Sequence, residues 1–93
     1  MSVTVRIPTP LRTATGGQST AQVEGGSVGD VVAALDRAHP GIGERLLDEQ
    51  GRIRRFVNLF VDDQDVRFSG GLATPVPDGA TVSIIPAVAG GSD

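Results

Sequence analysis

The sequence predicts an α+β fold in which a mixed sheet of four or five strands carries one main helix across one face. Two observations predict it. Apolar residues alternate as in strands in both halves of the chain, and one amphipathic helical segment lies between them. The length of 93 residues suffices for a single small domain with one core.

The first segment is predicted to be a strand because Val3, Val5 and Ile7 alternate with polar residues. Turn-forming prolines and glycines then occupy residues 8–17, and residues 18–24 alternate again. The sequence therefore predicts a hairpin with a long, mobile loop.

A helix is predicted to begin after Ser27, which offers an N-cap with an acidic residue three positions on. Its apolar stripe has the spacing i, i+3, i+4 and i+7 and consists of Val28, Val31, Val32 and Leu35. The run His39-Pro40-Gly41 ends this helix, and residues 42–47 predict one further helical turn.

Residues 56–61 predict a strand with two different faces. Aliphatic side chains occupy its odd-numbered positions, whereas Phe56, Asn58 and Phe60 share the other face. The aliphatic face suits the core. We interpret the aromatic face as a candidate docking surface for a partner.

The rest of the second half predicts a turn and two more strands. Residues 62–65 include three aspartates but lack the glycine and distal glutamate of a calcium loop, so they predict a turn. Residues 66–68 predict a short strand, and residues 81–85 predict the last strand, which is entered through the turn Pro77-Asp78-Gly79. The last strand can lie parallel to the first because the helical connection supplies the crossover. This arrangement is a β-grasp fold.

Composition excludes several classes of function. The chain has no cysteine and one histidine, so it lacks the ligands for a zinc site and the bases for a histidine-based catalytic triad. The net charge of −3 argues against nucleic-acid binding. We find no signal-peptide pattern and no membrane-spanning run, so we predict a cytoplasmic protein without a metal, a cofactor or a membrane partner.

The last predicted strand leads into a diglycine with only Ser92 and Asp93 beyond it. Because glycine has no Cβ, Ala89, Gly90 and Gly91 can thread a channel too narrow for larger side chains. One cut before Ser92 would free the Gly91 carboxylate for delivery to another protein's active site. We therefore predict a β-grasp domain over residues 1–86 and a flexible tail over residues 87–93, with the chemistry at Gly91.

These motifs resemble the ubiquitin-like sulfur carrier proteins of the ThiS/MoaD family, and within it the CysO type of actinobacterial cysteine biosynthesis. The resemblance spans nearly the whole chain, and its longest segment is the most specific. It rests on Arg55-Phe56-Val57-Asn58, Asp65-Val66-Arg67-Phe68-Ser69-Gly70-Gly71-Leu72-Ala73-Thr74, Pro77-Asp78-Gly79 and Pro86-Ala87-Val88-Ala89-Gly90-Gly91.

The resemblance implies a carrier rather than an enzyme. An E1-like, ATP-dependent enzyme would adenylate the Gly91 carboxylate, and sulfide or a persulfide would displace AMP to leave a thiocarboxylate. In the CysO branch the recipient is a pyridoxal-phosphate (PLP)-dependent cysteine synthase-type enzyme, and a JAMM-type metalloprotease releases the cysteine. This chain departs from the simple pattern by continuing past Gly91, so we expect a protease of that class to cut before Ser92.

Other functions remain open on the sequence. The carrier could supply sulfur for thiamine, molybdopterin or secondary-metabolite (thiosugar-type) biosynthesis. It could instead be a ubiquitin-like protein modifier, although without lysine it cannot polymerise on itself through side-chain amides. It could also be the small subunit of an enzyme such as molybdopterin synthase, or an interaction module with an inert tail.

Overall fold

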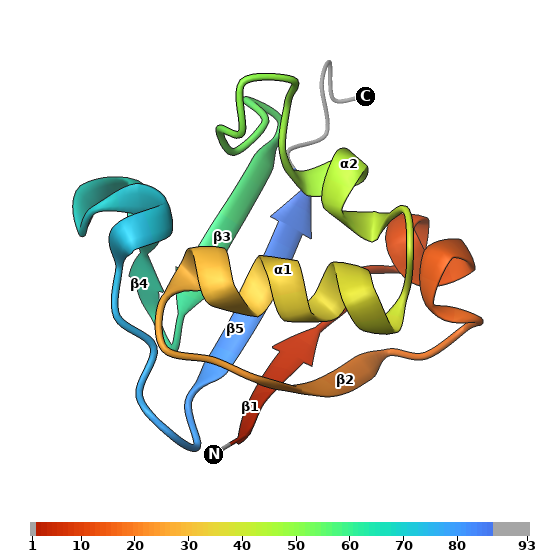
Figure 1. Cartoon of the computed structure of the whole chain (residues 1–93), viewed down its shortest axis with the longest axis horizontal. Coiled ribbons are helices and arrows are strands. Elements are labelled where there is room, and N and C mark those ends of the chain that lie inside the picture. The colour runs from red at the N-terminus through yellow and green to blue at the C-terminus, as the bar shows by residue number, and fades with distance from the viewer. Residues whose placement is uncertain (1, 87–93) are drawn as a thin grey trace.

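A computed structural model describes residues 2–86 of the chain. Within that range five strands form one mixed sheet in the order β2-β1-β5-β3-β4 (Figure 1). Helix α1 (Val28–Ala38) crosses one face of the sheet, and the short helix α2 (Ile42–Leu46) follows it. The predicted β-grasp architecture is confirmed. The predicted tail over residues 87–93 lies outside the described residues.

The strand register confirms the predicted parallel placement of the last strand. Strand β1 (Ser2–Arg6) pairs antiparallel with β2 (Thr20–Glu24) and parallel with β5 (Thr81–Pro86). Strand β5 also pairs antiparallel with β3 (Val57–Val61), whose other edge carries the two-residue strand β4 (Gln64–Asp65). The last strand therefore lies in the middle of the sheet.

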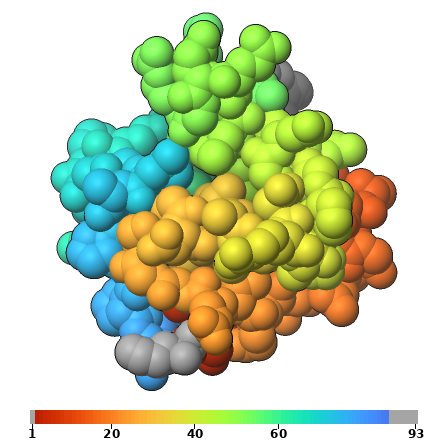
Figure 2. Space-filling model, in the orientation of Figure 1, coloured from red at the N-terminus to blue at the C-terminus, as the bar shows by residue number. Residues whose placement is uncertain are grey.

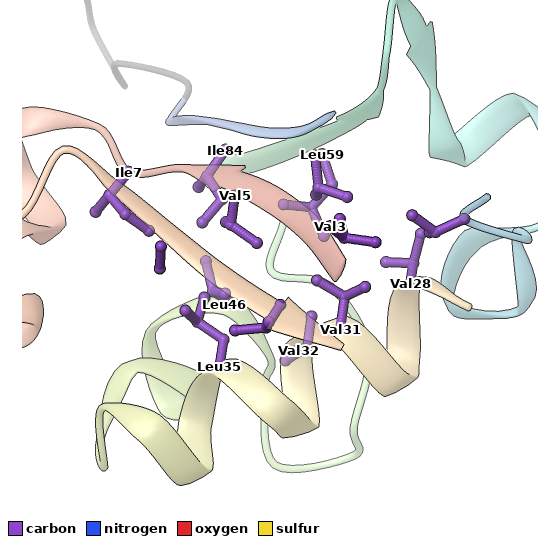
Figure 3. Close-up of a cluster of buried hydrophobic side chains, with 14 of the residues drawn as sticks. Val3, Val5, Ile7, Val28, Val31, Val32, Leu35, Leu46, Leu59 and Ile84 are labelled. Carbon is purple, nitrogen blue, oxygen red and sulfur yellow. The ribbon is translucent and has the colours of Figure 1, made fainter. Parts of the chain in front are cut away.

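The core lies between α1 and the sheet, where the apolar side chains of the helix point toward the strands (Figure 3). In the space-filling view, α1 and the segment that follows it cover this side of the sheet (Figure 2). Every residue of the predicted helical stripe is buried, as are the alternating apolar residues of the strands. The largest fully buried side chains include Ile7, Leu35, Ile42, Leu46 and Leu59. Removal of this apolar surface from water is the main force that stabilises the fold.

Helix α1 begins and ends where the sequence predicts. The Oγ of Ser27 accepts the backbone N–H of Asp30 at 3.2 Å, which satisfies one of the free donors of the first turn. At the other end, the His39 N–H donates to the Leu35 carbonyl before Pro40 stops the helix.

The predicted turn at Pro77-Asp78-Gly79 fixes the start of β5 against β1. Gly79 adopts a φ of +82°, which favours glycine, and its N–H donates to the Ser2 carbonyl at 2.9 Å. The Oδ1 of Asp78 accepts the Ser2 N–H, also at 2.9 Å. These two bonds set the alignment of the chain's last strand with its first.

The connection between β1 and β2 differs from the prediction. Instead of a long loop, it contains the 3₁₀ helix η1 (Thr9–Thr15), in which Leu11 and Thr15 are buried. The Thr15 hydroxyl lies 3.2 Å from the Arg12 carbonyl oxygen and 2.9 Å from that of Gln18. The connection thus packs against the core through η1. Strand β2 begins at Thr20, two residues later than predicted.

The predicted strand over residues 66–68 is wrong. These residues form the 3₁₀ helix η2 (Val66–Phe68), and a further 3₁₀ turn, η3 (Gly71–Ala73), follows it. The cause is local. The Oδ1 of Asp65 accepts the Arg67 N–H at 2.9 Å, and such a side-chain bond to the backbone replaces the strand ladder. The turn predicted over residues 62–65 is confirmed for Asp62, at a φ of +55°, and Asp63, whereas Gln64 and Asp65 form strand β4.

Candidate functional site

The segment with the predicted reactive carboxylate leaves from the centre of the sheet. Strand β5 ends at Pro86, the last described residue, and is held by β1 on one side and β3 on the other. Five residues span at most about 17 Å, so Gly91 can lie up to that distance from a firmly held strand end. The predicted site residues Ala89, Gly90, Gly91 and Ser92 lie outside the described residues and stay predictions.

The sheet face opposite α1, called here the open face, carries two of the three predicted docking residues. Phe60 is paired with Ser83 of β5, and Asn58 with Ile85. Both predicted residues are half-buried, whereas Ile85 is 48% exposed. Phe60 and Ile85 are diagonal neighbours on adjacent strands, close enough for their side chains to form one surface, called here the apolar patch.

Ile85 was not among the predicted docking residues. A signal was available, because Ile85 is out of phase with Val82 and Ile84, which are both buried. An apolar residue in the polar phase of an alternating strand faces solvent and not the core. An exposed apolar side chain beside Phe60 is the kind of feature that marks a binding surface.

Phe56, the third predicted docking residue, lies one residue before β3 and is 51% exposed. It is therefore on the surface, as predicted, but outside the paired part of the strand. Phe68 was not singled out by the sequence analysis and is 88% exposed. The neighbouring Arg67 links η2 to the start of β3, because its guanidinium donates to the carbonyls of Arg55 at 3.0 Å and Val57 at 2.9 Å.

A hollow among the described residues lies beside α1, and two of its acidic side chains are engaged by backbone N–H groups. It has a volume of about 680 Å³, and its acidic lining residues are Asp36, Glu44, Asp48 and Glu49. The N–H groups of Arg52 and Gln50 bind Asp48 and hold the pKa of its carboxyl below the ordinary value. Asp36 likewise accepts the N–H groups of Gly41 and Gly43.

Two features are absent from residues 2–86. No group of three or more histidine, cysteine, aspartate or glutamate side chains is placed to hold a metal ion. In the same range, no helix has both the length and the apolar character needed to cross a bilayer.

The sheet, its central last strand and the helix across it define a ubiquitin-like β-grasp protein. The chain matches the ThiS family over residues 5–91 and belongs to that family. It is 54% identical over 93 residues to the sulfur carrier protein CysO of Mycobacterium tuberculosis, with 98% of this chain and 100% of that protein covered.

Two further comparisons are with a solved structure and with an archaeal protein. The structure superposes on a chain of the Amycolatopsis orientalis BexX/CysO complex with a TM-score of 0.90 and 49% identity, covering 96% of this chain and 99% of the other. The small archaeal modifier protein 3 of Haloferax volcanii is 38% identical over 65 residues, which is 70% of each chain.

Proposed function

We propose that this protein is a sulfur carrier that holds sulfur as a thiocarboxylate on Gly91 and donates it for cysteine biosynthesis. The observation that supports this most is the 54% identity, over the full length of the relative, to a protein named sulfur carrier protein CysO. The fold supports it too, because the segment that carries Gly91 follows a strand at the centre of the sheet.

The chemistry requires activation by a partner. A carboxylate is a poor electrophile, so the Gly91 carboxylate first attacks the α-phosphorus of ATP and expels pyrophosphate. Sulfide then attacks the acyl carbon of the adenylate, and AMP leaves with the bonding electron pair. The product is an anionic thiocarboxylate, which is a soft nucleophile and needs no neighbouring general base.

Composition favours this form of sulfur storage. The chain has no cysteine, so sulfur cannot be held on a side chain as a persulfide. The thiol-like reactivity of the loaded protein would then come only from its backbone terminus. An E1-like adenylating enzyme and a PLP-dependent cysteine synthase-type enzyme are the partners that this proposal requires.

Activation at Gly91 requires removal of Ser92 and Asp93. A JAMM-type metalloprotease that cuts after diglycine would expose the Gly91 carboxylate in the same way that it would later release cysteine. Incubation of the full chain with a purified protease of this class should yield a chain that ends at Gly91. An intact chain after incubation would show that another enzyme does the trimming.

The intact mass of the protein purified from its own cells tests the proposal. We expect a chain that ends at Gly91 with one carboxyl oxygen replaced by sulfur. The matched control is a variant with Gly90 and Gly91 both replaced by alanine, in which the sulfur should be absent. A native chain that still ends at Asp93 would contradict the proposal and support an interaction module with an inert tail.

A ubiquitin-like protein modifier is the second candidate, and the similarity to small archaeal modifier protein 3 favours it. Such a modifier would form an amide between Gly91 and a lysine of another protein. The two functions differ in cell extracts. A modifier gives heavy conjugates that disappear with the double alanine variant, whereas a carrier stays at its own mass.

A further inference from the structure

A second hollow lies at the end of β1 and β5, beside the strand end from which the Gly91 segment departs. Its volume is about 540 Å³, and it is called here the basic hollow. The side chains that give it its chemistry are Arg6, Arg12, Ser19, Thr20 and Ser83. Two guanidinium groups and three hydroxyl groups supply hydrogen-bond donors, and no acidic side chain is among the lining residues within 2–86.

One of the two arginines is held in place. The Nε of Arg12 donates to the Ile7 carbonyl oxygen at 3.1 Å, which fixes the guanidinium beside the hollow. Arg6 is different. It is the exposed last residue of β1, and its side chain belongs to the open face because the buried residues of β1 occupy the opposite phase. The hollow thus combines a fixed guanidinium with one that can adjust.

The strand register connects the basic hollow to the apolar patch. Arg6 is paired with Thr20 of β2 and with Ser83 of β5, and Ser83 is paired with Phe60 of β3. Adjacent strands lie about 4.8 Å apart, so the backbones of Arg6 and Phe60 are about 10 Å apart. A protein surface of ordinary interface size that covers Phe60 therefore also covers Arg6.

We propose that the partner that covers the apolar patch places a carboxylate side chain in the basic hollow, between Arg6 and Arg12. This inference rests on the proposed sulfur-carrier function and names the chemistry of the adenylating enzyme's docking site. Guanidinium groups bind carboxylates through paired hydrogen bonds of defined direction. Because the hollow adjoins the end of β5, such a pair fixes the origin of the tail relative to the enzyme's active site.

Charge complementarity favours a carboxylate over a cationic group as the occupant. The whole chain has a net charge of −3, so an acidic partner surface is repelled over most of this protein. The basic hollow is a local exception on the open face. A pair formed there raises the rate of encounter and selects one orientation, because other orientations bring like charges together.

The test reverses the charge of Arg6 and compares it with a matched reversal elsewhere. Arg37 is exposed on α1, on the other side of the sheet, so Arg37→Glu changes the net charge by the same amount. Chains that end at Gly91 are assayed for ATP–pyrophosphate exchange by the cognate adenylating enzyme. We expect Arg6→Glu to raise the KM for the carrier about tenfold or more with kcat unchanged, and Arg37→Glu to change KM less than about twofold.

A milder variant and a salt series separate docking from misfolding. Arg6→Gln removes the charge without reversing it and should raise KM by a smaller factor. Added salt should raise the KM of the wild-type chain and have less effect on that of Arg6→Gln, because the screened ion pair is already lost. Urea unfolding midpoints equal to that of the wild type will establish that these exposed substitutions leave the fold intact.

Three results would overturn the inference. One is a KM for Arg6→Glu within twofold of the wild type. Another is an equal rise in KM for Arg37→Glu, which would indicate a general effect of charge. The third is a fall in kcat for Arg6→Glu at an unchanged KM, because Arg6 would then act after docking. No exchange with the wild-type chain would instead contradict the sulfur-carrier proposal itself, so the two failures are distinguishable.

Discussion

Phe60 is the residue that best tests the open face, because it lies in the apolar patch and its side chain contributes little to the core. Phe60→Asp places a charge where a partner must bury apolar surface. We expect the KM for the carrier in the exchange assay to rise about tenfold, while the free energy of unfolding changes by less than about 1 kcal/mol. The exchange kinetics and a urea titration measure the two quantities.

Phe68 provides the matched control for that experiment. It is the same residue type and is 88% exposed, but it lies on η2 and not on the open face. Phe68→Asp should leave the exchange kinetics unchanged. If Phe68→Asp raises KM and Phe60→Asp does not, the docking surface lies along η2, and the open face is excluded.

Gly25 is a position where a single methyl group should disturb the core. A Cβ at Gly25 would lie 2.9 Å from a Cγ2 atom of Val3 and of Val31, and both of these side chains are fully buried. Such overpacking typically costs about 1–3 kcal/mol, so Gly25→Ala should lower the free energy of unfolding by that amount in a urea titration.

The neighbouring Gly26 supplies the control, because a Cβ there would meet mainly the end of the flexible Asp30 side chain. Gly26→Ala should therefore cost less than Gly25→Ala. Equal costs for the two variants would mean that the segment between β2 and α1 shifts as a unit to relieve the contact.

At the scale of elements, the N-cap of α1 contributes a measurable share of stability. Ser27→Ala removes the acceptor for the Asp30 N–H and should cost about 1 kcal/mol in the free energy of unfolding. Ser27→Asp keeps an acceptor at the same position and should retain most of that stability. Loss of stability in both variants would indicate that the Ser27 hydroxyl acts through its packing.

The elements that the sequence predicted correctly are those with a local cause. Helix α1 has a cap, an apolar stripe and a stop signal within its own residues, and β5 has a turn and an alternation. The 3₁₀ segments η1 and η2 have fewer signals within their own residues. The first depends on burial of Leu11 by the rest of the fold, and the second combines the local Asp65 cap with hydrogen bonds from Arg67 to carbonyls ten and twelve residues away.

At the scale of the whole molecule, the sequence predicted the topology and only part of the site. The aromatic face was predictable because Asn58 and Phe60 alternate within one strand. The basic hollow was not, because Arg6, Arg12 and Ser83 come from three elements that meet only when β5 enters the sheet beside β1. Patterns within one segment do not reveal a surface assembled across strands.

The predicted division of the chain into a stable domain over residues 1–86 and a reactive tail over residues 87–93 leads to a test on the whole molecule. Among the described residues the core extends to Ile84, and β5 is paired with β1 as far as Ser83 and with β3 as far as Pro86. Deletion of residues 87–93 should therefore change the free energy of unfolding by less than about 0.5 kcal/mol, as for surface changes away from the core. The same deletion should abolish ATP–pyrophosphate exchange, because the carboxylate to be adenylated is absent.

Deletion of only Ser92 and Asp93 is the control for this experiment. That chain ends at Gly91, so it should unfold at the same urea concentration as the full chain and should support exchange without prior protease treatment. A lower unfolding midpoint for the chain that ends at residue 86 would place part of the tail in the folded domain. Exchange by the full chain without trimming would show that adenylation does not require a free Gly91 carboxylate, and the reactive group would then have to be sought at Asp93.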